Sequence, residues 1–151
     1  MLDRYALTKS AQTIIERSRQ EAQTRNHPEV KPFHILLAMT VTPEGTASLI
    51  LRRLGINSTA IIRDIEAREP KGKKPFKATP LLSEKSQKVM DKAYRLAKAA
   101  NQTSIGSEHI LLALFQVPSM ASQLLDAQDT EYEAVERELR LLTRSSRAKV
   151  H

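Results

Sequence analysis

The sequence contains no cysteine, which excludes disulfide bonds, thiolate metal ligands and a thiol nucleophile, and which fits a reducing compartment. No apolar run approaches the roughly 18 residues of a membrane span, and no signal-peptide core follows the first residues. Aromatic residues are scarce, with three Tyr and three Phe among 151 residues. No stretch alternates β-branched and aromatic residues, so the sequence predicts an all-α protein.

The residue patterns of catalytic and cofactor sites are also missing. Gly72 is followed by Lys73 and Lys74, but no glycine stands at the earlier position of a G-x-x-x-x-G-K-[ST] phosphate loop, so we expect no ATP hydrolysis. His34 and His109 have no Glu or His four residues later to complete a helical metal pair. We interpret both as buried or capping histidines that bond to the backbone across the seam between repeats. The sequence thus predicts no enzyme, no cofactor and no metal site.

Acidic residues are absent from the two segments that carry the positive charge. The net charge is +7, and four lysines in residues 70–80 together with four cations in residues 140–151 exceed that total. The excess therefore lies in a linker and a tail, and a basic stripe on the fold is not expected. A weak, non-specific nucleic-acid binder that works through these segments remains a distant alternative to the solvated connector and frayed terminus that we expect.

A duplication is the main feature that is present. The pentapeptide His-Ile-Leu-Leu-Ala occurs at residues 34–38 and again at 109–113. The same offset of 75 residues aligns Leu7 with Leu82 and Leu49 with Leu124, which indicates two copies of one structural unit. The second copy lacks a counterpart of Gly55, and its fourth helix matches at an offset of 74, which one deletion at a turn explains.

Each copy reads as four short helices with recognisable start signals. Thr8, Asn57 and Ser58 in the first copy, and Ser83 and Ser107 in the second, are suitable N-cap residues. The second helix of each copy is apolar nearly all round, so we expect it to be the buried hub, and the hubs and the helices before them to meet at the seam. The prediction is about eight helices in a single double-repeat domain: repeat one (1–69), basic linker (70–80), repeat two (81–143) and basic tail (144–151).

Two segments carry a resemblance to a known family. Residues 26–38 and 105–114, with Gly106, Ser107, Glu108 and His109 ahead of an aliphatic run, resemble the double repeat of the Clp N-terminal domain of ClpB-, ClpC- and ClpA-type AAA+ unfoldases. The resemblance covers nearly the whole chain. It implies a non-enzymatic module that docks peptides, unfolded or tagged proteins or adaptors for a Clp chaperone or protease. A free-standing accessory subunit that binds the Clp protease core or competes for adaptors is the alternative.

The resemblance also implies candidate contact residues. In ClpC-like relatives a Thr-Glu pair lines a pocket for phosphorylated arginine; Ser107 and Glu108 fill that pattern, whereas Pro32 and Phe33 occupy the equivalent places in the first copy. The predicted peptide- or adaptor-binding residues are Ser107, Glu108, Phe33, Leu7 and Leu82. The expected partners are client proteins, adaptors and Clp ATPase or protease subunits, with no specific nucleic acid and no membrane. The expected location is the cytoplasm, or the plastid stroma if a transit peptide has been removed.

Overall fold

Two helices of the first repeat, α1 and α4, begin at the capping residues that the sequence predicts. The computed structural model describes residues 5–150, with side chains as far as residue 144. The Thr8 hydroxyl accepts a hydrogen bond from the Ala11 N–H at the start of α1, and the Asn57 side chain accepts one from the Ala60 N–H at the start of α4. These bonds satisfy N–H groups that have no partner inside the helix. The four helices are α1 (Lys9–Thr24), α2 (Pro32–Val41), α3 (Thr46–Arg53) and α4 (Ser58–Arg68).

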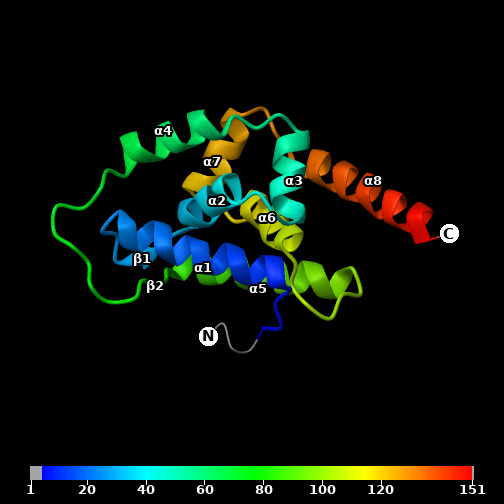
Figure 1. The fold of residues 1–151 in the computed structure, drawn as a ribbon, viewed down its shortest axis with the longest axis horizontal. Coiled ribbons are helices and arrows are strands. Elements are labelled where there is room, and N and C mark those ends of the chain that lie inside the picture. The colour runs from blue at the N-terminus through cyan, green and yellow to red at the C-terminus, as the bar shows by residue number, and fades with distance from the viewer. Residues whose placement is uncertain (1–4, 151) are drawn as a thin grey trace.

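The second repeat follows the same plan (Figure 1). Ser83 caps its first helix by accepting from the Ser86 N–H, as predicted. The helices are α5 (Glu84–Ala99), α6 (Ser107–Gln116), α7 (Met120–Ala127) and α8 (Tyr132–Val150). Two repeats of four helices in residues 5–150 confirm the predicted all-α architecture.

Two short parallel pairings were not predicted from the sequence. β1 (Glu29–Val30) pairs with β2 (Leu81–Leu82), so that Val30 lies opposite Leu82, and Leu7 forms an isolated parallel bridge with Ile105. Positions 7 and 82, like positions 30 and 105, are separated by the repeat offset of 75, so the two pairings are copies of one contact. Each repeat thus pairs the residue before its first helix with the residue before the second helix of the other repeat.

The offset between the repeats changes at the turn before the third helix. The C-caps of α2 and α6, Thr42 and Val117, are 75 residues apart, whereas the N-caps of α3 and α7, Gly45 and Ser119, are 74 apart. The deletion that the sequence predicts at a turn therefore lies between α6 and α7.

This shift corrects two details of the sequence alignment. At an offset of 74, the counterpart of Leu124 is the buried Ile50, not Leu49. The left-handed position of Gly55, with φ of 71°, has a counterpart after all, because Asp129 adopts φ of 55° there. Aspartate tolerates this region better than most non-glycine residues, so the second repeat keeps the turn without a glycine.

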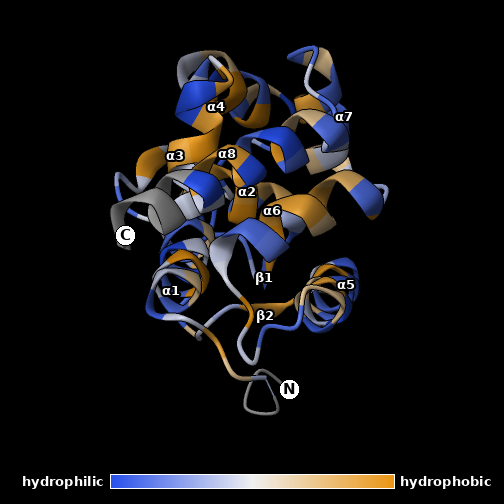
Figure 2. Ribbon diagram, turned by 90° about the vertical axis from the view of Figure 1, so that its right-hand side faces the viewer, coloured by the Kyte–Doolittle hydropathy of each residue, from blue (hydrophilic) through white to orange (hydrophobic). Residues whose placement is uncertain are grey.

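The second helix of each repeat forms the core. α2 and α6 contact each other, α2 packs on α1 and α6 on α5, and each also contacts the first and third helices of the other repeat. Figure 2 shows both helices as largely hydrophobic ribbons between the outer helices. Ile35, Leu36, Ile110 and Leu111 are fully buried. The expected seam between the hubs and the helices before them is confirmed, with the third helices added to it.

The linker and the tail differ from each other in structure. Residues 70–80 contain no helix or strand, and Figure 1 shows them as a long connection from α4 to β2. In the tail, α8 continues as far as Val150. α8 is therefore longer than its counterpart α4, with 19 residues against 11.

No single helix within residues 5–150 is long and apolar enough to cross a membrane. Two helix pairs, α2 with α3 and α6 with α7, are together long and apolar enough for a membrane span by length and composition alone. The two helices of each pair are, however, bent by 79° and 91° relative to each other. Both pairs include a hub helix of the core.

Candidate functional site

The N-terminus of α6 is capped differently from the prediction. Gly106, not Ser107, is the N-cap residue, and the imidazole Nδ1 of His109 accepts the Gly106 N–H at 2.9 Å. His34 does the same at the start of α2, where its Nδ1 accepts the Lys31 N–H at 2.9 Å. Both histidines are buried and cap helices, as expected, but they bond to the backbone of their own repeat rather than across the seam.

Ser107 instead caps a helix of the other repeat. Its side chain is fully buried, and its hydroxyl accepts the Ala47 N–H of α3 at 3.1 Å. The N-cap of α3 is Gly45, which has no side chain to do this and adopts φ of 99°. At the equivalent place α7 carries its own cap, Ser119, and the counterpart of Ser107 is Pro32, which has no hydroxyl. Ser107 therefore joins the repeats.

Replacing Ser107 with alanine is expected to lower the free energy of unfolding by about 1 to 2 kcal/mol, because the Ala47 N–H loses its acceptor inside the protein. Urea denaturation followed by circular dichroism measures this loss. Thr103→Ala, at an exposed position of the preceding loop, is the control and should change stability by no more than about 0.5 kcal/mol. Equal stability of both variants would contradict the capping role.

Glu108 lies beside this cap, in the first turn of α6, with 22% of its side chain exposed. Its carboxylate covers Gly106, where a Cβ atom would stand 1.6 Å from Oε1. The carboxylate complements the positive end of the helix dipole. Oε1 lies 3.8 Å from Nδ1 of His109, but burial lowers the pKa of His109 and Nδ1 already accepts a backbone N–H, so no ion pair forms between them at neutral pH.

The five predicted contact residues fall in two places related by the repeat. Leu7 pairs with Ile105, just before Ser107 and Glu108 in the chain. Leu82 pairs with Val30, shortly before Phe33. Leu7 and Leu82 are half-buried, and Phe33 is only 2% exposed. Glu108 and the two leucines are thus accessible in part, and the ligand-binding roles of all five remain predictions.

Phe33 contributes to a surface hollow at the second of these places. The hollow has a volume of about 430 Å³ and lies where α2, α5 and α7 begin, with Pro32, Ser83 and Ser119 among its lining residues. The Phe33 and His34 rings pack with centroids 4.1 Å apart. Phe33 is therefore mainly a core residue with one edge on this hollow.

Sequence reasoning missed a chain of hydrogen bonds that runs from the α2 cap to the linker. Because Nδ1 of His34 accepts a backbone N–H, its Nε2 carries the proton and donates to Nδ1 of His27 at 2.8 Å. Nε2 of His27 then donates to the Pro70 carbonyl at 3.0 Å. Burial, and next the charges of His27, Arg25 and Lys31, lower the pKa of His34 to about 3. The His34 ring is therefore held in a single neutral tautomer.

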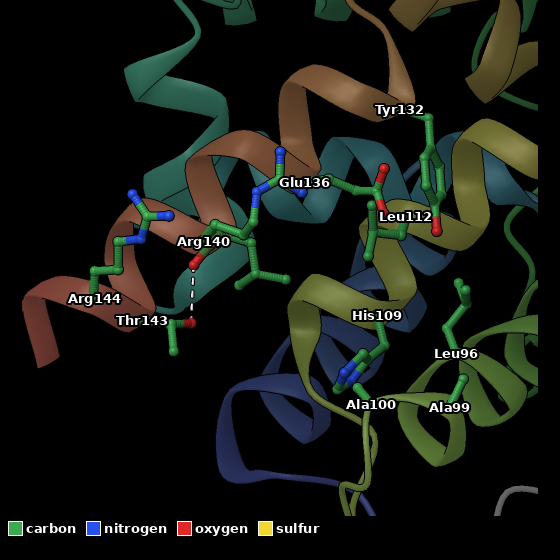
Figure 3. Close-up of a pocket in the computed structure, with 11 residues that line it drawn as sticks. Leu96, Ala99, Ala100, His109, Leu112, Tyr132, Glu136, Arg140, Thr143 and Arg144 are labelled. Carbon is green, nitrogen blue, oxygen red and sulfur yellow. Dashed lines mark hydrogen bonds between the residues drawn. The ribbon is translucent and has the colours of Figure 1, made fainter. Parts of the chain in front are cut away.

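A groove at the C-terminal end of the second repeat was also missed. It lies between the end of α5, the start of α6 and α8, and has a volume of about 470 Å³ (Figure 3). Leu96, Leu112 and Leu139 give it apolar walls, and Tyr132, Glu136 and Arg140 are among its polar residues. Burial, together with the carboxylates of Glu136 and Glu133, raises the pKa of Tyr132, so its hydroxyl stays protonated. Within the described residues no group of three metal-ligating side chains occurs.

Fold and surface together define an all-α double-repeat domain with shallow grooves near its helix ends. The family described as the Clp repeat (R) N-terminal domain matches residues 6–128 and 81–147. The chain belongs to this family, which confirms the resemblance seen in the sequence.

Individual relatives agree with this assignment. The chain is 30% identical over 127 residues to the chaperone protein ClpB of Bacteroides thetaiotaomicron, covering 83% of this chain and 15% of ClpB. Among solved structures, the Hsp104 N-terminal domain from Candida albicans shares the fold with a TM-score of 0.74 at 19% identity, over 89% of this chain and 91% of that chain. A ClpV N-domain in complex with a VipB peptide has a TM-score of 0.62 at 21% identity, over 78% of this chain and 76% of that chain.

Proposed function

We propose that this chain is a docking module that binds peptides, unfolded chains or adaptor proteins for a Clp-type chaperone or protease. The observation that carries the proposal is the match of the Clp repeat family to residues 6–128, together with a related N-domain, that of ClpV, whose structure holds a VipB peptide. The chain spans only 15% of the length of its ClpB relative. The role involves reversible binding and no chemical step.

Glu108 is the contact that we assign to a basic group of the ligand. Its carboxylate is partly exposed at the start of α6, and the missing side chain of Gly106 leaves room for that carboxylate to lie over the turn. A carboxylate can accept two hydrogen bonds from the planar guanidinium of arginine. The half-buried Leu7, beside this turn through its bridge to Ile105, supplies apolar contact.

Replacing Glu108 with alanine is expected to weaken binding of phosphoarginine or of an arginine-containing peptide about tenfold, since a charge-assisted pair contributes roughly 1.5 kcal/mol. Isothermal titration calorimetry measures the affinity, and thermal denaturation checks that the domain remains folded. Glu133→Ala is the matched control, because Glu133 is also an acidic residue in the first turn of a helix. Unchanged affinity in the Glu108 variant would remove Glu108 from the site, and no binding to the unmodified protein would count against the docking role.

A further inference from the structure

In the first repeat, the linker is bound through its backbone at the C-terminal end of α1. The Gly72 N–H donates to the Arg25 carbonyl at 2.9 Å, and the Asn26 side-chain amide donates to the Gly72 carbonyl at 2.9 Å. Further along, the Gln23 side-chain amide donates to the Phe76 carbonyl at 2.7 Å. These bonds reach the backbone of the linker, so they hold the chain largely independently of its side chains.

The Arg25 carbonyl and the Asn26 side-chain amide hold Gly72 between them, and we call this pair of groups the bracket. The bracket has room only for glycine. A Cβ atom at this position would lie 2.6 Å from the Asn26 carbonyl oxygen and 3.1 Å from the Asn26 Cβ atom. The first distance is shorter than real contacts of a Cβ atom, and the oxygen belongs to a backbone that cannot yield easily. Any larger residue would have to displace the segment.

The second repeat contains the counterpart of this bracket. The counterparts of Arg25 and Asn26 are Ala100 and Asn101, and Asn101 adopts φ of 59° against 58° for Asn26. Within the described residues, neither the Ala100 carbonyl nor the Asn101 side chain has a hydrogen-bond partner among the bonds that hold the loops and caps. The start of the segment that corresponds to the linker continues α8 as helix.

The groove of Figure 3 opens beside this bracket, with Ala100 on its wall. Leu139 is half-buried there, whereas its counterpart in the first repeat, Ile65, is fully buried. The charge of the side chains beside the bracket also differs in sign between the repeats. In the first repeat Glu66 pairs with Arg25 at 3.3 Å, but the counterpart of Glu66 is the exposed Arg140, and Arg144 also lines the groove. Only Glu136 offsets them there.

We propose that this groove binds a non-helical, acidic peptide segment with a glycine at its centre. The glycine takes the place that Gly72 takes in the first repeat, between the Ala100 carbonyl and the Asn101 amide. Apolar side chains pack on Leu96, Leu112 and Leu139, and carboxylates face Arg140 and Arg144. The inference rests on the proposed docking role but concerns a separate surface, because Glu108 does not line the groove.

The probe is an octapeptide built from the linker, residues 69–76, with its three lysines replaced by glutamate: Glu-Pro-Glu-Gly-Glu-Glu-Pro-Phe. We expect calorimetry to detect binding that weakens at least tenfold when the peptide glycine is replaced by valine. Arg140→Glu should weaken binding by a similar factor, since it reverses a charge that faces the peptide. Asn101→Gly, which keeps the left-handed backbone and removes the amide, should weaken it about fivefold.

Arg137→Glu is the control for charge, because Arg137 is exposed on the same helix and does not line the groove; it should leave affinity within twofold. Glu108→Ala should not affect this peptide, which separates the groove from the Glu108 site. Equal binding of the glycine and valine peptides, or of the Arg140 and Arg137 variants, overturns the proposal. Self-association that Arg140→Glu abolishes also overturns it, because a second copy would then be the occupant. If phosphoarginine binds and the octapeptide does not, the groove assignment fails while the docking role stands.

Discussion

Replacing either Ile35 or Ile110 with alanine is expected to lower the free energy of unfolding by about 2 to 5 kcal/mol, with the protein still unfolding in one transition. Both side chains are fully buried in the hub helices, so each replacement leaves a cavity in the shared core. The single transition is expected because each repeat supplies a backbone pairing to the other and Ser107 caps a helix across the seam. Local damage in one repeat therefore destabilises both.

Urea denaturation followed by two probes tests this expectation. Far-UV circular dichroism reports all helices, and tyrosine fluorescence reports the second repeat when Tyr5 is replaced by phenylalanine, which leaves Tyr94 and Tyr132. Ile35→Val and Ile110→Val are the conservative controls and should cost about 0.5 to 1.5 kcal/mol. Two separate transitions, or curves that differ between the probes, would show that the repeats fold independently.

Acidification from pH 6.5 to pH 4.5 is expected to remove about 2 kcal/mol of stability through His34 alone. The folded-state pKa of His34 is lowered to about 3 from an ordinary value of 6.5. As the pH falls below 6.5, His34 therefore becomes protonated in the unfolded chain but stays neutral in the folded chain. The contribution is fully present above pH 6.5 and is lost as the pH falls toward 3. His109, whose pKa is also lowered by burial, acts in the same direction.

His34→Gln isolates this effect. The variant should be less stable at pH 7, because the chain of bonds through His27 to the Pro70 carbonyl is broken. Its free energy of unfolding should, however, decline less steeply between pH 6.5 and 4.5 than that of the unmodified protein. Urea midpoints at four pH values give both slopes, and parallel slopes would show that His34 titrates normally in the folded state.

Helix positions could be predicted from the sequence because the signals that set them are local. Thr8, Asn57 and Ser83 cap helices as expected, and the inward residues of α1 recur at helical spacing. The strand pairs could not be predicted, since two residues are too few to show a period of two. The repeat offset, however, aligns Leu7 with Leu82 and Val30 with Ile105. These same four residues form the pairs in the structure, Leu7 with Ile105 and Val30 with Leu82.

The site was only partly predictable for a different reason. Ser107 looked like an N-cap because hydroxyl residues before a helix usually are, and only the fold shows that it serves α3 instead of α6. The binding groove beside Ala100 depends on where α8 runs after the repeat ends, and the basic residues of that segment suggested a frayed end. The left-handed conformation of Asp129 could not be predicted, because aspartate adopts this region only occasionally and glycine is the usual residue there.

The exchanged pairings of Leu7 with Ile105 and of Val30 with Leu82 are those expected of a symmetric dimer of one repeat. A lone four-helix unit would carry one half of each pairing and no partner for it. Two identical chains related by a twofold axis would complete both pairings at once, as in a symmetric dimer. Joining two such chains by a linker as long as residues 70–80 would raise the effective concentration of one half near the other. Once joined, the two halves could differ in sequence while each still needed the other for its backbone pairing.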